Sequence, residues 1–301
     1  MSNLLVREKI GYSNIYKLSG YLFILPALFL FCVFVIYPAI SSLYLSFRII
    51  SPFGDRSIFI GLKNYINLFQ SNNYINSLKV TGIFVLYTVI IGLPFSLLIS
   101  MFLNLPLKGI SGFRTIFFLP LAISPVMAGV IWIFLLNPNI GLLNHLLSVI
   151  GLVGPSWRTD PNWALPTVII VTIWKQLGFN IIIFLAALQN VPLELYEAAS
   201  IDGANSWRKF VKITIPLISP TILFLTITSV IQSFESFGAI DVLTSGGPAN
   251  TTNVLVYALY KDAFVNFRTG YASAQAYIIF MILLLISVFQ FKFMNKKVHY
   301  Q

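Results

Sequence analysis

The sequence predicts an all-α integral membrane protein with about six transmembrane helices, and two features support this fold class. Charge is scarce, because 57% of the 301 residues are hydrophobic and only 9% are charged. A soluble domain carries about 25% charged residues, so this chain lacks the charge to cover a water-exposed surface. The apolar residues also form runs of about 20 or more, the length that crosses a bilayer as a helix.

Six runs meet this criterion, and each is expected to form a helix because lipid offers no partners to open backbone groups. They are Leu18–Leu45, Val80–Leu103, Ile116–Leu136, Ala164–Leu188, Ile213–Phe234 and Ala272–Phe291. Prolines inside these runs predict kinks rather than breaks. These are Pro26, Pro94, Pro120 and Pro125.

The first run is expected to remain in the protein as a span. It is longer than the apolar core of a signal peptide, and no small-residue cleavage pattern follows it. The chain therefore divides into a polar segment at 1–17, a membrane domain at 18–293 and a polar tail at 294–301.

Basic residues predict the orientation. The net charge is +10, and most of the basic residues flank the apolar runs, so membrane topology explains them better than nucleic-acid binding. With the N-terminus inside, eleven basic residues lie on the inner side and seven on the outer side, and Lys175 lies within a span. This bias favours cytoplasmic N- and C-termini.

The loops divide into three outer and two inner segments. The outer loops are Phe47–Lys79, with a short amphipathic stretch at Leu62–Phe69, then Asn137–Asn162 and Glu235–Tyr271. The inner loop Asn104–Phe113 is short, whereas Gln189–Lys212 is longer and unlike the rest of the chain. The single cysteine, Cys32, excludes an internal disulfide. The two histidines are far apart in the sequence and do not have the spacing of metal ligands.

The long inner loop predicts a bent helical knob. Pro192 can open a helix, and Glu194 and Glu197 lie in its early turns, where the positive end of the helix dipole favours acids. Gly203 permits a sharp bend, and a second short helix carrying Trp207 and Phe210 then leads into the fifth run. Such a knob favours docking to another protein; an amphipathic loop lying on the membrane is the alternative.

This loop resembles the EAA loop of ABC importer permeases. The residues at the family's spacing are Glu197, Ala198, Ala199, Asp202, Gly203, Ala204, Phe210, Ile213 and Pro216. The resemblance implies the six-helix type I permease fold, with a coupling loop that fits a groove on a separate ATP-binding subunit. Glu197 then makes polar contact with that subunit, and Gly203 sets the bend.

Further segments resemble the carbohydrate-uptake branch, of the first-permease type. They are Gln189–Leu195, Thr244–Pro248, Gly270–Ala274 and the tail Lys297–Gln301. One departure is that Gly238 follows Phe237, where many relatives have an aspartate, and the acid occurs at Asp241. The resemblance implies import of a sugar or sugar-like solute, and oligosaccharide, glycosylated glycerol and glycerol 3-phosphate all stay open.

The resemblance also implies partners. They are a second homologous permease, two copies of a cytoplasmic ATPase, and an extracytoplasmic binding protein that docks at Gly246, Gly247 and Pro248. The resemblance also implies that the chain resides in the bacterial inner membrane. The chain has no glycine-rich phosphate loop with a following Lys-Ser or Lys-Thr. We therefore expect a transport subunit and not an enzyme, with no cofactor or metal of its own and with ATP and Mg on the partner ATPase.

Two polar stripes predict the solute pathway. The residues of each stripe recur at helical spacing. The stripe on the fourth run consists of Thr172, Lys175, Gln176, Phe179 and Asn180, and the stripe on the fifth run consists of Ser229, Gln232, Ser233 and Ser236. A charge at mid-bilayer costs roughly 2.5–3.5 kcal/mol, so Lys175 should face a cavity or a partner helix. Helix–helix packing is the alternative for both stripes.

Two other functional classes fit the sequence less well. A secondary transporter that works without an ATPase needs ionisable residues at the midplane and usually two repeated halves. Only Lys175 lies near that depth, and no repeat is visible. An integral-membrane enzyme needs clustered His, Asp or Glu, whereas the nine acids here are scattered.

Overall fold

The computed structural model describes residues 21–51 and 56–294. The expected N-terminal segment and the family-like tail Lys297–Gln301 lie outside the described residues. Within them the chain is mostly helical, with one small antiparallel hairpin, β1 (Arg48–Ile50) and β2 (Ser57–Phe59), in which Ile49 pairs with Ile58. The all-α fold class is confirmed.

Four helices in the described part are long and apolar enough to cross a membrane. They are the helix Tyr21–Ser46, which contains η1 (Cys32–Ile36) and α2 (Tyr37–Ser46), then α4 (Asn72–Leu103), α8 (Pro161–Gln189) and α15 (Thr269–Met294). Counting each of two bent helix pairs as one span raises the number to six. The expectation of about six spans agrees with this upper count.

The first bent pair corrects the expectation of one kinked helix over Ile116–Leu136. The run forms α5 (Ile110–Ala122) and α6 (Pro125–Leu135), whose axes differ by 110°. Ser124, which precedes a proline, is extended, and its hydroxyl accepts a hydrogen bond from the Met127 amide. Ser124 and Pro125 are therefore the N-cap and first residue of a new helix, and Pro125 produces a break rather than a kink.

The second bent pair moves the start of the fifth span from Ile213 to Ser219. Here α10 (Ser206–Lys209), η2 (Phe210–Thr214) and α11 (Ile215–Leu217) precede α12 (Ser219–Phe234) at an angle of 68°. Pro216 and Pro220 have no amide hydrogen, so two helical hydrogen bonds are missing at this point. The Ser219 hydroxyl donates to the Pro216 carbonyl at 2.6 Å instead.

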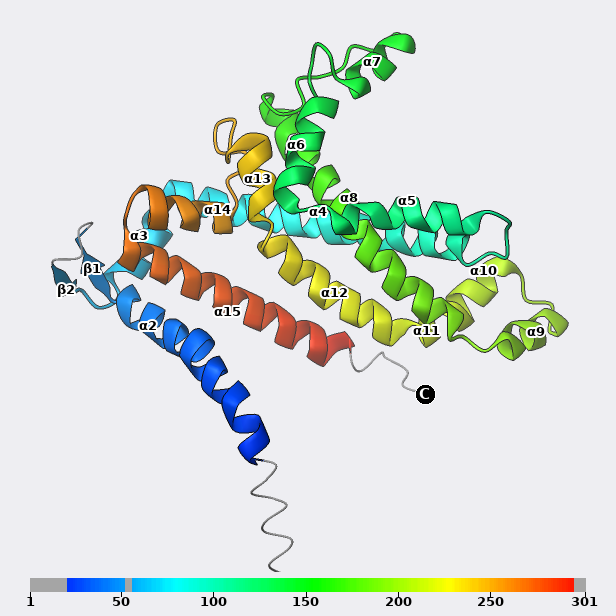
Figure 1. The fold of residues 1–301 in the computed structure, drawn as a ribbon, viewed down its shortest axis with the longest axis horizontal. Helices are drawn as coiled ribbons and strands as arrows, with labels where there is room; N and C mark the ends of the chain where they lie inside the picture. Colours follow the sequence, from blue (N-terminus) through cyan, green and yellow to red (C-terminus); the bar gives the residue numbers. More distant parts are fainter. Residues whose placement is uncertain (1–20, 52–55, 295–301) are drawn as a thin grey trace, which may run out of the picture.

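The short elements gather at the two ends of the long helices (Figure 1). At one end lie the hairpin, α3 (Lys63–Gln70), α14 (Leu255–Tyr260) and η3 (Lys261–Val265), and at the other lie α9 (Leu193–Ile201) and α10. Between them, α6 and α7 (Leu142–Val149) project away from the bundle, next to α13 (Phe237–Thr244). The helix α3 agrees with the amphipathic stretch expected at Leu62–Phe69.

The core forms where α4 and α8 pack against each other. Phe84, Val168 and Ile181 are fully buried there. Small residues let the two backbones approach, because Gly92 faces Ile173 and the Ser100 hydroxyl reaches the Ile181 carbonyl at 3.3 Å. By contrast, the side chains from residue 21 to residue 40 are all exposed, as suits a helix that contacts lipid or another chain.

Candidate functional site

The loop between α8 and α12 forms a sharply bent elbow, defined here as residues 193–209. Helix α9 ends in a Schellman motif, in which the Gly203 amide bonds to the Ser200 carbonyl at 3.1 Å and the Ala204 amide to the Ala199 carbonyl at 2.8 Å. Gly203 has φ +75°, in the left-handed region that glycine adopts without cost. Asn205 then caps α10 by accepting from the Arg208 amide. Gly203 therefore lies at the bend, where it was expected.

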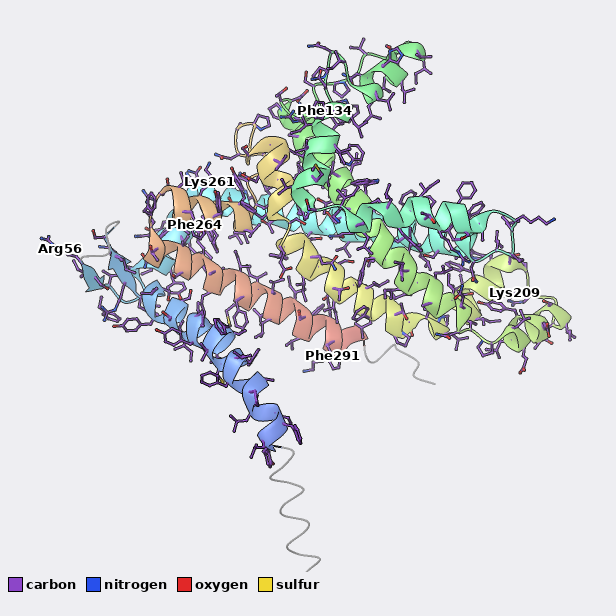
Figure 2. The ribbon with its side chains drawn as sticks, viewed as in Figure 1. Arg56, Phe134, Lys209, Lys261, Phe264 and Phe291 are labelled. Carbon is purple, nitrogen blue, oxygen red and sulfur yellow. The ribbon has the colours of Figure 1, made fainter. Side chains whose placement is uncertain are left out.

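The elbow is tied to the bundle on one side and exposed on the other. The Tyr196 hydroxyl bonds to the Thr214 hydroxyl at 2.8 Å, and Phe210 packs into a small core cluster beside Leu188 and Ile218. On the open side, the side chains of Ile201 and Trp207 are 88% and 71% exposed. Figure 2 shows Lys209 at this end of the molecule. The elbow thus presents apolar side chains that nothing in the described chain covers.

The predicted coupling residues divide by exposure. Glu197, Ala198, Asp202 and Gly203 are exposed, whereas Ala199, Ala204 and Phe210 are half-buried. The Glu197 carboxylate makes no hydrogen bond or ion pair within residues 21–51 and 56–294, which leaves it available to a partner. The methyl side chains around it add little bulk, so another surface can approach the α9 backbone closely.

A cavity of about 230 Å³ lies between α8, α12, α6 and the start of α13. Five of the nine predicted pathway residues line it, namely Thr172, Lys175, Gln176, Gln232 and Ser236. They supply an ammonium group, two amides and two hydroxyls, and the walls are completed by small apolar side chains such as Ala128 and Ala239. This lining can form hydrogen bonds to a hydroxylated solute.

The other four predicted pathway residues do not line this cavity. Asn180, Ser229 and Ser233 are buried between helices, and the Ser233 hydroxyl bonds to the Ser229 carbonyl of its own helix at 2.7 Å. Phe179 packs against the cluster that contains Phe184 and Leu225. In this structure the alternative interpretation, helix–helix packing, describes these four better.

Lys175 lies against the break between α5 and α6. Its ammonium group donates to the carbonyls of Pro120 at 2.7 Å and Leu121 at 3.2 Å. Both belong to the last turn of α5, which carries the negative end of the helix dipole, and the Pro120 carbonyl also accepts from the Ile123 amide at 3.3 Å. Lys175 therefore faces both a cavity and a partner helix, as expected because a charged side chain exposed to lipid is energetically unfavourable.

Sequence reasoning missed Glu235 as a pathway residue. It is the C-cap residue of α12 and lines the same cavity as Lys175, on the opposite helix. The signal was present, because Glu235 lies three residues after Gln232 and next to Ser236 and so extends the fifth-span stripe. The cavity therefore holds one basic and one acidic side chain.

Helices α8 and α12 connect the cavity to the elbow. Both carry cavity residues, and the elbow lies in the chain segment between them, which also contains η2 and α11. Figure 1 shows the two helices converging on α9 and α10. The elbow is therefore continuous in the chain with two helices that form walls of the cavity.

The loop that contains Gly246, Gly247 and Pro248 is folded tightly at the other end of α13. Gly246 is buried with φ +78°, and a side chain there would meet the Tyr257 ring at 2.6 Å. The Thr252 hydroxyl donates to the Gly247 carbonyl at 2.7 Å. Burial, reinforced by the Asp241 carboxylate, raises the pKa of the Tyr257 hydroxyl. Gly246 therefore shapes this loop, and the exposed residues at its tip are Ser245, Ala249 and Asn250.

Two glycines let α13 pack on α6. A side chain at Gly238 would lie 3.2 Å from Pro125, and one at Gly129 would lie 2.9 Å from Val242. Gly238 is the position where the sequence departs from many relatives. Here it allows the first turn of α13 to contact the first turn of α6, where both line the cavity.

Comparison with known proteins gave consistent matches. Residues 71–299 match the family described as "Binding-protein-dependent transport system inner membrane component". The chain is 38% identical to the sn-glycerol-3-phosphate transport system permease protein UgpA of Agrobacterium fabrum, over 94% of this chain and 97% of that protein. It is also 38% identical to UgpA of Yersinia pestis, over 93% of this chain and 95% of that protein.

Solved structures agree with these sequence matches. A bacterial ABC transporter involved in the import of the acidic polysaccharide alginate matches with a TM-score of 0.82 and 28% identity, over 95% of this chain and 98% of that chain. A bacterial alginate ABC transporter in complex with an alginate pentasaccharide-bound periplasmic protein matches with a TM-score of 0.80 and 28% identity, over 93% of this chain and 95% of that chain.

Proposed function

The chain belongs to the family of binding-protein-dependent transport system inner membrane components, and from this premise we propose how it moves its solute. It is a multi-pass inner-membrane permease of an ABC importer, a transport subunit rather than an enzyme. We propose that the solute is a sugar or sugar-like molecule, such as an oligosaccharide, a glycosylated glycerol or glycerol 3-phosphate. The named relatives, a glycerol-3-phosphate permease and an alginate importer, support this class.

The proposed complex contains more than this chain. It works with an extracytoplasmic binding protein, as the related alginate transporter does in its complex with a periplasmic protein. A second, homologous permease and two cytoplasmic ATPase copies complete it, and ATP and Mg bind to the ATPase while this chain binds no cofactor. The exposed helix from residue 21 to residue 40 and the open apolar surface of the elbow leave room for such partners.

The elbow is the proposed docking element for the ATPase. The observation that carries this proposal is the bend at Gly203, which is closed by a Schellman motif and leaves Ile201 and Trp207 exposed. On both sides of the elbow the chain continues into helices that line the cavity. Burial of such side chains in a groove on the ATPase is favourable by about 25 cal/mol per Å² of apolar surface. Glu197 and Asp202 supply polar contacts around them.

Transport follows from this connection. When the ATPase subunits close on ATP, the elbow moves with them, and α8 and α12 carry that motion to the cavity. The cavity then opens outward to receive a solute from the binding protein near Gly247 and Pro248. Hydrolysis separates the ATPase subunits and returns the cavity to its inward-facing state.

The proposal is tested by uptake into vesicles that contain the whole complex. Gln176→Ala removes an amide from the cavity without touching the elbow, and we expect the KM for solute to rise several-fold while the complex stays assembled. Gln70→Ala, an exposed glutamine outside the cavity, is the matched control. Unchanged KM in the Gln176→Ala complex, or uptake by the isolated chain without ATPase, contradicts the proposal.

A further inference from the structure

A second cavity, of about 500 Å³, lies where the first long helix ends and α15 begins. Arg48 follows the helix end at Ser46 by two residues, and Arg268 directly precedes Thr269, the first residue of α15. Both arginines line this cavity. Because α2 and α15 pack together, the two arginines lie at the same end of the bundle and so at the same membrane surface.

Gly270 holds the two chain segments together at this point. A side chain there would lie only 1.9 Å from the Arg48 carbonyl oxygen, so α15 approaches β1 this closely because the residue is a glycine. The buried Asn64 amide donates to the carbonyls of Ser46 at 2.8 Å and Arg48 at 3.0 Å. The backbone around the cavity is thus constrained on both sides.

The guanidinium groups keep free donors. Arg48 donates one hydrogen bond, from Nη1 to the Ser57 hydroxyl at 3.1 Å, and lies over the Tyr44 ring at 4.3 Å. The Arg268 guanidinium makes no side-chain hydrogen bond within the described part of the chain. An arginine side chain has five N–H donors, so most of those on this pair have no acceptor from the described chain.

The rest of the lining also favours an anion. Gly270 and Tyr271 lie in the first turn of the 26-residue helix α15, where backbone amides have no acceptor within the helix and the dipole is positive. Asn67 adds a side-chain amide, and so does Asn266, whose Nδ2 also donates to the Asp262 carboxylate at 2.9 Å. No Asp or Glu of the described residues lines this cavity.

The position of the cavity identifies the source of the anion. Two spanning helices end here, so it lies at the depth of lipid headgroups, and the exposed side chains of Ile49 and Phe267 flank it with apolar surface. A headgroup that carries an ammonium would find no carboxylate in the lining, because the nearby Asp262 carboxylate lies outside it and accepts from Asn266 and Gln275. We propose that this cavity binds the phosphate of an anionic phospholipid, with Arg48 and Arg268 as its ligands. This inference rests on membrane residence and is independent of the transported solute.

Native mass spectrometry of the full chain, purified with equal amounts of phosphatidylglycerol and phosphatidylcholine, tests the site. We expect selective retention of phosphatidylglycerol, and about a tenfold loss of its affinity in Arg48→Gln/Arg268→Gln, because two charge-assisted contacts are removed. The matched control is Arg56→Gln. Figure 2 shows Arg56 at the outermost edge of the hairpin, at the same end as Lys261 and Phe264.

A second variant tests the same site independently, in case the double variant misfolds. Asn67 is exposed, so Asn67→Asp places a carboxylate in the cavity without disturbing the core, and phosphatidylglycerol retention should again fall. Asn72→Asp, outside the cavity, should leave it unchanged. Equal retention in the wild-type and cavity variants overturns the proposal, and so does an equal loss in Arg56→Gln. Displacement of the lipid by millimolar inorganic phosphate would instead assign the site to a free anion.

Discussion

At the scale of single residues, Gly203 and Lys175 show how local chemistry determines this structure. Gly203 supplies the left-handed conformation that closes α9 and turns the chain into α10. Lys175 donates to the carbonyls at the end of α5. The first shapes the surface offered to a partner, and the second stabilises a helix end inside the membrane domain.

Gly203→Val is predicted to uncouple the complex. A non-glycine residue in the left-handed region costs about 1–2 kcal/mol, and a β-branched side chain lies at the upper end of that range. Co-purification of the ATPase with the permease measures the effect, and uptake should fall in parallel. Gly203→Asn is the control, because asparagine tolerates this conformation. Normal uptake and ATPase binding by Gly203→Val would show that the bend is dispensable.

Lys175→Met is predicted to destabilise the contact between α5 and α8. The substitution keeps a long side chain but removes the ammonium donor from both carbonyls, so that Pro120 keeps the Ile123 amide and Leu121 loses its Lys175 contact, at a cost of about 1 kcal/mol. Thermal unfolding of the detergent-solubilised complex should occur at a lower temperature. Lys175→Arg, which keeps the charge and the donors, should recover most of the stability. If Lys175→Met unfolds at the wild-type temperature, the hydrogen bonds to α5 contribute nothing.

At the scale of elements, the broken pair α5 and α6 positions the cavity. The break at Ser124 directs α6 away from the bundle, where α13 packs against it through Gly129 and Gly238. The cavity lies between this pair and helices α8 and α12. An unbroken third span would remove the α6 wall, so the break is part of the site.

Gly129→Leu is predicted to push α13 away from α6. Even a Cβ at this position meets Val242 at 2.9 Å, and overpacking of this kind typically costs about 1–3 kcal/mol. Gly112→Leu is the matched control, because that helical glycine has open space around it. Thermal stability and uptake should both fall for Gly129→Leu and recover in part when Val242→Ala is added. Equal effects at Gly112 and Gly129 would contradict the packing argument.

Features that depend on neighbouring residues could be predicted from the sequence, whereas features that depend on packing between helices could not. The elbow was predictable because Pro192 and Gly203 act on their nearest neighbours, whereas the Asn205 cap of α10 was found only in the structure. The break at Pro125 was missed because the apolar run continues through it, although Ser124 is a good N-cap. Helical spacing placed Asn180 and Ser233 in stripes, but spacing alone cannot say whether a neighbouring helix covers a stripe. Glu235 was overlooked because it follows the last apolar residue of its run.

At the scale of the whole molecule, the chain connects two ends of a membrane domain. The elbow lies at one end, the cavity lies along α8 and α12, and the loop around Gly247 lies near the opposite end (Figure 1). The exposed apolar side chains of the elbow, which is not part of a long spanning helix, are available to the partner proposed above. Coupling between the elbow and the cavity is the central claim.

Cysteine cross-linking from the elbow tests that claim most directly. In a Cys32→Ser background, which has no other cysteine, Ile201→Cys places a thiol on the exposed elbow, and Val153→Cys, at a 98% exposed side chain away from the elbow, is the control. We expect Ile201→Cys to cross-link to the ATPase subunit in membranes, with loss of solute uptake that is restored by reduction. Absence of any cross-link to a nucleotide-hydrolysing subunit, or undiminished uptake in the cross-linked complex, would contradict the account.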